Sequence, residues 1–334
     1  MLNGFGGVKL LISEIIPSVI RVRGEYKPSI GYPSSYILLG DGEIAIIDTG
    51  TLDFPRREIL KPIEKRGYNI QKHVKMIIIT HPHPDHIGGL KWLKNKTKAE
   101  VAVFEGVQEL LRKPSKIFEN NFKIGTLSKL KLKTLNPTFD YEELRGVDVD
   151  HPLEQGETLT FGDHKLRVYH TGGHCFGHIV LYDPSQEVLF AGDEVLCHPQ
   201  SPLKFFIDLT GNVEKREHTL KVLNKLNPKY LLPAHDEPRI DEQAKIALET
   251  ALEAHNIWEE TVKDAVKALN KGKLSEIGEY VRKLLNIKWT QGMDVLVNDL
   301  TTLAFLKHLE EKGKVERIKD KKDTLWKSKN TNLI

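Results

Sequence analysis

The sequence has few cysteines and lacks long apolar runs. Only 2 of its 334 residues are cysteine, which excludes a disulfide scaffold and favours a cytoplasmic location. Charged residues interrupt the apolar stretches within about ten residues, short of the roughly 20 that a membrane-spanning helix needs. The N-terminal segment 8–17 contains Glu14 and has no small-residue cleavage site, so we expect a first strand there and no membrane association.

Three common catalytic signatures are also absent. The chain has no Gly-x-Ser-x-Gly nucleophile elbow, no Gly-x-x-x-x-Gly-Lys-Ser/Thr phosphate loop and no Gly-x-Gly-x-x-Gly dinucleotide fingerprint. A net charge of +3 is too small to indicate an acidic partner. The hydrophobic fraction of 40% and charged fraction of 28% predict a soluble globular chain, long enough for one large and one small domain.

Residues 81–86, His-Pro-His-Pro-Asp-His, place three imidazoles and one carboxylate in a single turn. Residues 75–80 before them are short, apolar and β-branched, which predicts a buried strand, and residues 87–93 predict the start of a helix. The polar groups would therefore lie at the carboxyl end of a strand, where open α/β sheets place their chemistry. A surface run or a histidine tag is the alternative, but a tag would lie at a terminus.

Imidazole and carboxylate groups suit zinc, iron and manganese. Four of them exceed the needs of one catalytic metal, which keeps a position open for water. We therefore expect His81 and His83 to serve one ion, and Asp85 and His86 to serve a neighbouring one. Other ligands must come from elsewhere, and four more segments combine a predicted strand with polar residues at its end: 44–50, 165–174, 188–193 and 230–236.

With these segments the chain resembles the metallo-β-lactamase superfamily, in the branch that includes glyoxalase II, RNase Z and lactonases. The resemblance covers about residues 15 to 250, and five motifs in the family order carry it: Asp48-Thr49-Gly50, His81-x-His83-x-Asp85-His86, Gly173-His174, Gly192-Asp193 and Ala234-His235. It implies that one metal is held by His81, His83 and His174. It implies that the second is held by Asp85, His86 and His235, with Asp193 bridging both and Asp48 in a supporting role.

The resemblance also bears on residues near the motifs. Class B1 β-lactamases carry a cysteine in place of Asp193, so β-lactam hydrolysis is not favoured. We expect His178 to support the site without binding metal. We expect Cys175 to be a packed thiol, and Cys197 and His198 to line the pocket wall.

The fold implied is α+β, a four-layer αβ/βα metallo-β-lactamase sandwich of two mixed sheets flanked by helices. The cofactors implied are two divalent metal ions, with zinc expected and iron or manganese as alternatives. A hydroxide bridging the metals would be the nucleophile, oriented by Asp85, with Asp193 also catalytic. The expected substrate is a small-molecule thioester, lactone or other ester; the alternative is endonuclease action on single-stranded RNA. A binding protein without turnover is disfavoured by the intact set of seven ligands.

An insertion at about residues 105–150 interrupts the alternation of strands and helices. Between Arg112 and Lys133 it contains one acid, Glu119, and seven basic residues: Arg112, Lys113, Lys116, Lys123, Lys129, Lys131 and Lys133. These predict either a solvated face or a basic lid over the metals that attracts an anionic substrate. Phe118, Phe122 and Ile124 could supply an apolar wall.

The tail predicts a second unit, so we divide the chain into a catalytic domain at 1–254 and a winged-helix-like domain at 255–334. Helix signals at 259–270, 275–285 and 295–312 precede a basic hairpin at 314–318 and 324–327. Residues 314–329 hold seven basic and three acidic side chains. Contact with RNA phosphates and packing or homo-oligomer formation are both open interpretations.

Overall fold

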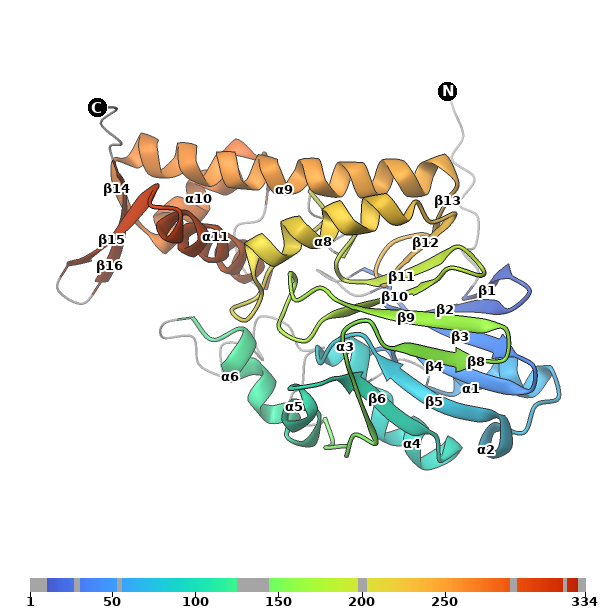
Figure 1. The fold of residues 1–334 in the computed structure, drawn as a ribbon. Helices are drawn as coiled ribbons and strands as arrows, with labels where there is room; N and C mark the ends of the chain where they lie inside the picture. Colours follow the sequence, from blue (N-terminus) through green and yellow to red (C-terminus); the bar gives the residue numbers. More distant parts are fainter. Residues whose placement is uncertain are drawn as a thin grey trace, which may run out of the picture.

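In the computed structural model, two mixed sheets face each other across a common core (Figure 1). The structure describes residues 11–26, 31–52, 56–124, 144–197, 203–288, 293–320 and 323–329. The first sheet has seven strands in the order β1-β2-β3-β4-β5-β6-β7. Its strands are β1 Ile12–Ile16, β2 Val19–Arg23, β3 Ser34–Gly40, β4 Glu43–Ile47, β5 Val74–Ile79, β6 Glu100–Phe104 and β7 His151–Leu153.

The second sheet has six strands in the order β13-β12-β11-β10-β9-β8. Its strands are β8 Thr158–Phe161, β9 His164–His170, β10 Ile179–Asp183, β11 Val188–Gly192, β12 Tyr230–Pro233 and β13 Arg239–Ile240. Each sheet combines antiparallel and parallel pairs, with β4, β5 and β6 parallel in the first and β11 and β12 parallel in the second. The carboxyl ends of these central strands are where the sequence places its histidines and aspartates.

Helices flank both sheets. The first sheet is flanked by α1 Arg56–Lys65, α2 Ile70–His73 and α4 Leu90–Thr97. The second is covered by α8 Val213–Leu226 and the first half of α9 Glu242–Leu269, which pack leucines and alanines on β10, β11 and β12. The short helix α3 Pro84–Ile87 follows β5, and the insertion contributes α5 Gln108–Arg112, the 3-10 turn Pro114–Lys116 and α6 Ile117–Asn121. None of the described helices combines the length and apolar character needed to span a bilayer.

The C-terminal region consists of helices and a three-stranded sheet. Helix α9 continues into it without a break, and α10 Leu274–Leu284 and α11 Met293–Glu311 pack against that helix. The sheet has the order β14-β16-β15, formed by β14 Lys271–Lys273, β15 Val315–Asp320 and β16 Asp323–Ser328. The predicted boundary between residues 254 and 255 therefore lies inside one helix, and the division into two domains stays a prediction.

Two local expectations differ from the structure. The helix expected to start within residues 87–93 begins at Leu90 as α4, and an additional one-turn helix, α3, begins at Pro84. Proline suits the first helical position because it lacks only an N–H that would have no partner there. The tail has three strands instead of two. Strand β14 was missed because Lys-Gly-Lys is short and has low β propensity.

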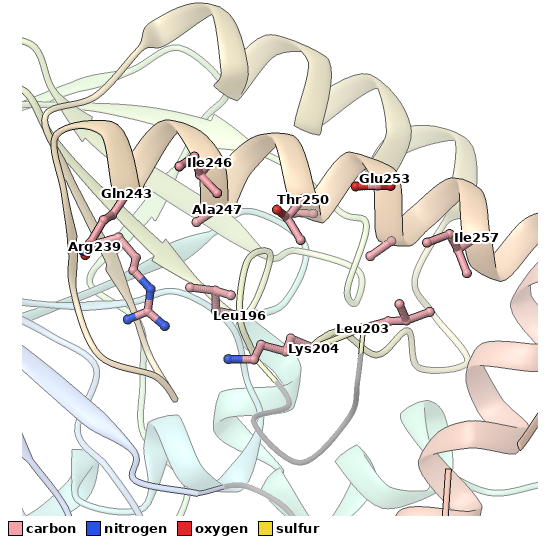
Figure 2. A pocket seen from close by; sticks show the side chains of 12 residues that line it. Leu196, Leu203, Lys204, Arg239, Gln243, Ile246, Ala247, Thr250, Glu253 and Ile257 are labelled. Atoms are coloured by element: carbon pink, nitrogen blue, oxygen red, sulfur yellow. The ribbon is translucent and has the colours of Figure 1, made fainter. Parts of the chain in front are cut away.

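A pocket of about 440 Å³ lies beside the first half of α9 (Figure 2). Its wall is formed by α9, and its floor by Leu196, Leu203 and Lys204. Arg239 of β13 closes one end.

Trp258 of α9 joins the C-terminal region to the segment after residue 203. Its side chain is 2% exposed, its ring stacks on Phe305 at 6.2 Å and it meets the edge of Phe205 at 5.8 Å. We predict that Trp258→Ala lowers the free energy of unfolding by about 3–5 kcal/mol, because a large buried ring leaves a cavity. Urea unfolding measures the loss. The matched control is Ile257→Ala, at a residue that is 38% exposed, which should lower the free energy of unfolding by under about 1 kcal/mol. Equal losses of stability in the two variants would contradict the packing role of Trp258.

A buried aspartate–histidine hydrogen bond links β9 to β10. Asp183 Oδ2 lies 2.7 Å from His164 Nδ1, and Asp183 Oδ1 accepts from Ser185 N at 3.0 Å. Burial alone would raise the pKa of Asp183, but the hydrogen bonds from His164 and Ser185 lower it below its usual value. A carboxyl with a lowered folded-state pKa contributes stability above its unfolded pKa of about 3.9, and this contribution is lost as the pH falls through the folded value.

We therefore predict that Asp183→Asn destabilises the metal-free protein by about 1–3 kcal/mol at pH 7, because the buried partners lose a charged acceptor. The deficit should shrink as the pH falls from about 4, the unfolded-state pKa, through the lower folded-state pKa, where the parent aspartate itself protonates. Urea midpoints of parent and variant at pH 7 and through this range test this. The exposed neighbour Asp163→Asn is the control, and a deficit that does not change with pH would rule out the proposed linkage.

Candidate metal centre

The histidine turn is held by close backbone packing. Strand β5 ends at Ile79, His81 and His83 follow in extended chain, and Asp85 and His86 lie in α3. A Cβ on Gly88 would come within 2.3 Å of the Leu52 nitrogen, and one on Gly89 within 2.5 Å of the Thr49 oxygen. Only glycine lets the turn pack this closely on the loop that begins at Asp48.

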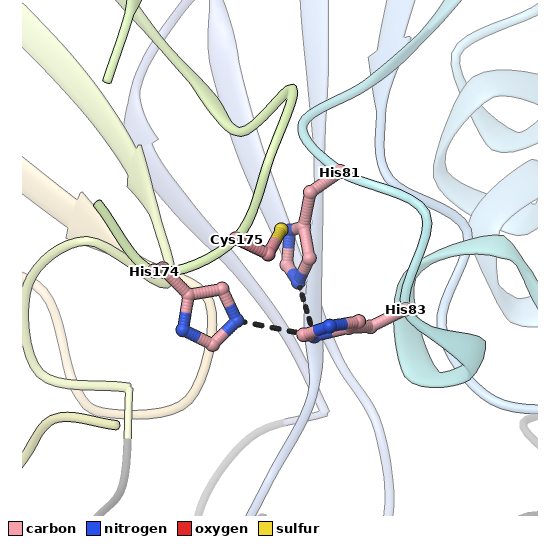
Figure 3. A group of neighbouring side chains, drawn as sticks. All are labelled: His81, His83, His174 and Cys175. Atoms are coloured by element: carbon pink, nitrogen blue, oxygen red, sulfur yellow. Dashed lines mark hydrogen bonds between the residues drawn. The ribbon is translucent and has the colours of Figure 1, made fainter. Parts of the chain in front are cut away.

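The first group of side chains brings His174 onto this turn. His83 Nδ1 lies 3.0 Å from His81 Nε2 and 3.1 Å from His174 Nε2 (Figure 3). His174 comes from the loop between β9 and β10, so the two sheets meet at this point. All three imidazoles are buried.

The second group consists of Asp85, His86 and His235, the last from the end of β12. His235 Nε2 lies 3.3 Å from His86 Nε2 and 3.2 Å from Asp85 Oδ2. His86 Nε2 lies 3.7 Å from the same carboxylate oxygen. These three side chains are also buried.

Asp193, directly after β11, lies between the two groups. Its Oδ2 is 3.6 Å from His174 Nε2 and 3.9 Å from His81 Nε2. Its Oδ1 is 3.3 Å from His86 Nε2 and 3.2 Å from His235 Nε2. The structure thus brings together all seven side chains named from the sequence, and each oxygen of Asp193 faces one group.

The donor atoms fit cations. Ligands of a tetrahedral ion with bonds of about 2.0 Å lie about 3.3 Å apart, close to the 3.0, 3.1 and 3.3 Å between facing imidazole nitrogens here. Within the described residues, Asp193 Oδ1 is buried without a hydrogen bond. Facing nitrogen lone pairs and a buried carboxylate oxygen are stabilised when a cation lies between them.

The electrostatics of the two groups differ. Burial lowers the pKa of His81 well below its usual value and that of His174 to about 4, so both are neutral ligands at neutral pH. Burial would also lower the pKa of His86 and His235, but the carboxylates of Asp193 and Asp85 raise both, to about 9 for His235. In the absence of a cation, protons on the second group balance the two carboxylates, and a metal ion must displace them.

Asp48 supports the second group, the role that the resemblance implied. Its Oδ2 lies 2.8 Å from His86 Nδ1, and both its oxygens accept hydrogen bonds from Thr80, from N at 2.8 Å and from Oγ1 at 2.7 Å. A proton on His86 Nδ1 leaves Nε2 free to face the cluster. This outer carboxylate therefore fixes both the tautomer and the ring orientation of His86.

The sequence did not reveal the groups that support the first set. The carbonyl oxygen of Phe206 lies 2.9 Å from His174 Nδ1, and Asp208 Oδ2 lies 3.0 Å from His83 Nε2. Asn121 of α6 donates to Asp208 Oδ2 at 2.6 Å. Asp208-Leu209-Thr210-Gly211 contains a turn signal, but turn signals are common and nothing in the sequence pairs this one with His83.

Glu194 and Arg216 form a second support that the sequence did not reveal. Arg216 Nη2 of α8 donates to the Glu194 carbonyl at 3.0 Å, and Glu194 Oε2 lies 3.4 Å from His174 N. Both side chains are buried. A Cβ on Gly173 would come within 2.4 Å of Glu194 Oε1, so glycine permits this contact beside His174.

The other residues that the sequence places near the motifs are His178, Cys175, Cys197 and His198. His178 Nε2 accepts from the Asp193 N–H at 2.9 Å, so His178 supports the site. Cys175 and Cys197 are buried, and burial raises the pKa of each thiol well above its usual value. Figure 3 shows the Cys175 sulfur beside the His81 ring. His198 lies outside the described residues.

The described part of the insertion packs against the first group. Phe122 is buried and its ring centre lies 5.0 Å from that of His83, so an apolar wall is present here. The basic rim stays a prediction. Arg112 is paired with Glu109 and Asp148, and Lys113 is paired with Glu109, whereas Lys129, Lys131 and Lys133 lie outside the described residues.

A family description and several relatives match this chain. The metallo-beta-lactamase superfamily matches residues 29–235, more than half of the chain, including all seven cluster residues. A hydroxyacylglutathione hydrolase from Maricaulis maris is 27% identical over 156 residues, which cover 47% of this chain and 44% of that one. An acyl-coenzyme A thioesterase from Homo sapiens is 33% identical over 173 residues, covering 48% and 57%. The chain thus spans about half the length of these relatives.

Two solved structures share the fold over nearly the whole chain. A metallo-beta-lactamase family protein from Thermus thermophilus superimposes with a TM-score of 0.75 at 22% identity, covering 95% of this chain and 100% of that one. A beta-lactamase domain protein from Burkholderia ambifaria has a TM-score of 0.71 at 18% identity, covering 95% and 93%. The chain belongs to the metallo-β-lactamase superfamily and is a metallohydrolase of that fold with a buried histidine–aspartate metal-binding cluster.

Proposed function

We propose that this metal-dependent hydrolase cleaves a thioester, or a related lactone or ester, at a two-metal centre. The position of Asp193, with one carboxylate oxygen toward each group of side chains, is the observation that carries the two-metal arrangement. The thioester is favoured because relatives with related sequences are named hydroxyacylglutathione hydrolase and acyl-coenzyme A thioesterase.

The ligand assignment follows the two groups. His81, His83 and His174 would hold one ion, Asp85, His86 and His235 the other, and Asp193 would contribute to both. We propose zinc because neutral imidazoles with carboxylates are its usual ligands, with iron and manganese as alternatives. When bound, such ions lower the pKa of water towards neutrality and polarise the carbonyl of the substrate.

The protein contributes orientation, proton acceptance and exclusion of water. Asp85 Oδ2 faces the second group, where it can accept a hydrogen bond from attacking water. Phe122 and Phe206 line the outer side of His83, with ring centres 5.0 and 6.0 Å from its own. These apolar rings keep the cluster dry, which strengthens its electrostatic interactions.

We further propose that the C-terminal region is a winged-helix-like unit. The support is its order of elements, in which the end of α9 leads to β14, then α10, α11 and the hairpin of β15 and β16. Exposed lysines on all three strands, Lys271, Lys319 and Lys327 among them, keep single-stranded RNA as the second candidate substrate. The cytoplasmic location and any homo-oligomer stay predictions.

Asp193→Ala should remove about one of two bound metal equivalents and lower kcat/KM by about a thousandfold or more, because it deletes the carboxylate shared by both groups. Elemental analysis of the purified protein, with hydrolysis assays on hydroxyacylglutathione, acyl-coenzyme A, lactones and short RNA, measures both effects. The exposed Asp163→Ala is the control. Full turnover in Asp193→Ala would reject the two-metal proposal, and cleavage of RNA without thioester hydrolysis would favour the second substrate.

Asp208→Asn should weaken binding of one metal ion by about 10–100-fold, because Asp208 orients His83 through Nε2. Competition with a coloured chelator measures the affinity, and excess metal should restore activity. Asp183→Asn is the matched control, since it alters another buried aspartate–histidine pair at the far end of β9 from the cluster. Unchanged metal affinity in Asp208→Asn would show that Asp208 does not orient His83 for metal binding.

A further inference from the structure

We propose that the pocket beside α9 binds the fatty acyl chain of the substrate, of medium or greater length, with its carbonyl end toward the metal centre. This inference rests on the proposed thioester hydrolysis and adds the substrate class. The pocket is separate from the seven cluster residues, none of which lines it.

The walls are mostly apolar; in addition to the cations Lys204 and Arg239, the polar side chains are Gln243, Thr250 and Glu253 of α9. The residues that supply the apolar surface are Leu196, Leu203, Ile246, Ala247, Ala251, Ala254 and Ile257. Ile246 is 51% exposed and Ile257 is 38% exposed, so two large side chains lie half in water along the open face of α9. Covering them with an alkyl chain would remove apolar surface from water, at a gain proportional to the area buried.

One end of the pocket is cationic. Figure 2 shows the charged ends of Lys204 and Arg239 on the same side of the pocket, with Leu203 and Ile257 at the other end. Lys204 Nζ lies 2.7 Å from Asp236 Oδ2, and Arg239 Nη2 lies 3.2 Å from Asp236 Oδ1. Among the described residues, Arg21 and Arg23 pair with Glu237 while Lys204 and Arg239 pair with Asp236, so four cationic side chains share two carboxylates in these pairs. A carboxylate is therefore attracted to this end and an apolar tail to the other.

The cationic end is also the end nearest to the metal centre along the chain. Asp236, which binds both cations, directly follows His235. Leu196 of the pocket floor comes three residues after Asp193. An acyl chain with its carbonyl near His235 would extend from these cations along α9, and the fatty acid released by hydrolysis would carry its carboxylate to the same place.

The dimensions suit an acyl chain longer than acetyl. The volume of about 440 Å³ falls within the range of small-molecule sites, about 300–1,000 Å³. The helical rise of about 1.5 Å per residue puts Ile257 about 16 Å from Ile246 along α9. A short acyl group would leave most of this surface uncovered.

The test compares two substitutions at helix residues of matched exposure. Ile246→Asp places a charge in the pocket, and Leu284→Asp, at a residue 49% exposed on α10, is the control. With acyl-coenzyme A thioesters from acetyl to dodecanoyl, we expect kcat/KM of the parent to rise by up to about fourfold per methylene as the chain enters the pocket. Ile246→Asp should flatten this rise and leave acetyl-coenzyme A unaffected, and Leu284→Asp should follow the parent.

Calorimetry with decanoate on the full-length protein tests the pocket without turnover. Ile246→Asp should weaken decanoate binding at least tenfold and Leu284→Asp should leave it unchanged. If the parent hydrolyses thioesters but the two variants behave alike, the pocket assignment is overturned while the proposed function stands. If no thioester, lactone or ester is cleaved but decanoate binding depends on Ile246, the proposed function fails and the acyl-binding pocket is supported. Sedimentation that shows a dimer broken by Ile246→Asp would overturn the proposal in favour of a self-association surface.

Discussion

The constraint on which the site depends is the burial of five imidazoles and two carboxylates within one small volume. Removing such groups from water is unfavourable unless each finds a partner. Here Asp193 provides one oxygen to each half of the cluster, and outer groups occupy the far nitrogens: Asp48 for His86, Asp208 for His83 and the Phe206 carbonyl for His174. The near nitrogens are left facing one another, an arrangement that cations stabilise.

The C-terminal region contributes to this arrangement through the segment after residue 203. Phe205 packs on Trp258 and Phe305. The Arg216 guanidinium lies 4.1 Å from the centre of the Phe205 ring. Phe206 and Asp208, which follow Phe205, contact His174 and His83 through the Phe206 carbonyl and the Asp208 carboxylate. Packing between α9 and α11 therefore fixes the backbone that orients the first ligand group, and the region is part of the structural support of the metal centre whatever its partners.

The part of the site that the sequence predicts is the part encoded locally. Each of the seven side chains follows a strand or lies in the turn after it, and strand ends are readable from apolar runs and their polar stops. Phe206 acts through its carbonyl, which no side-chain pattern reveals. Asp208 and Arg216 are brought to the cluster by tertiary contacts over long separations, with Asp208 125 residues from His83. The helix signal of α9 has no stop at residue 254, so only the change of packing partners along Glu242–Leu269 marks a boundary there.

The metal cluster and the pocket beside α9 draw on different parts of the chain. The superfamily match ends at residue 235, the last of the seven cluster residues. The α9 wall of the pocket begins at Gln243, beyond that end. The exposed side chains of the first half of α9 can change without disturbing the ligands, because the strands that carry the cluster are fixed by the two sheets. Trp258, further along α9, packs on Phe205 and belongs to the support of the cluster. The buried cluster therefore determines that the reaction is hydrolysis, whereas the surface along α9 lies outside the part of the chain that the superfamily match covers.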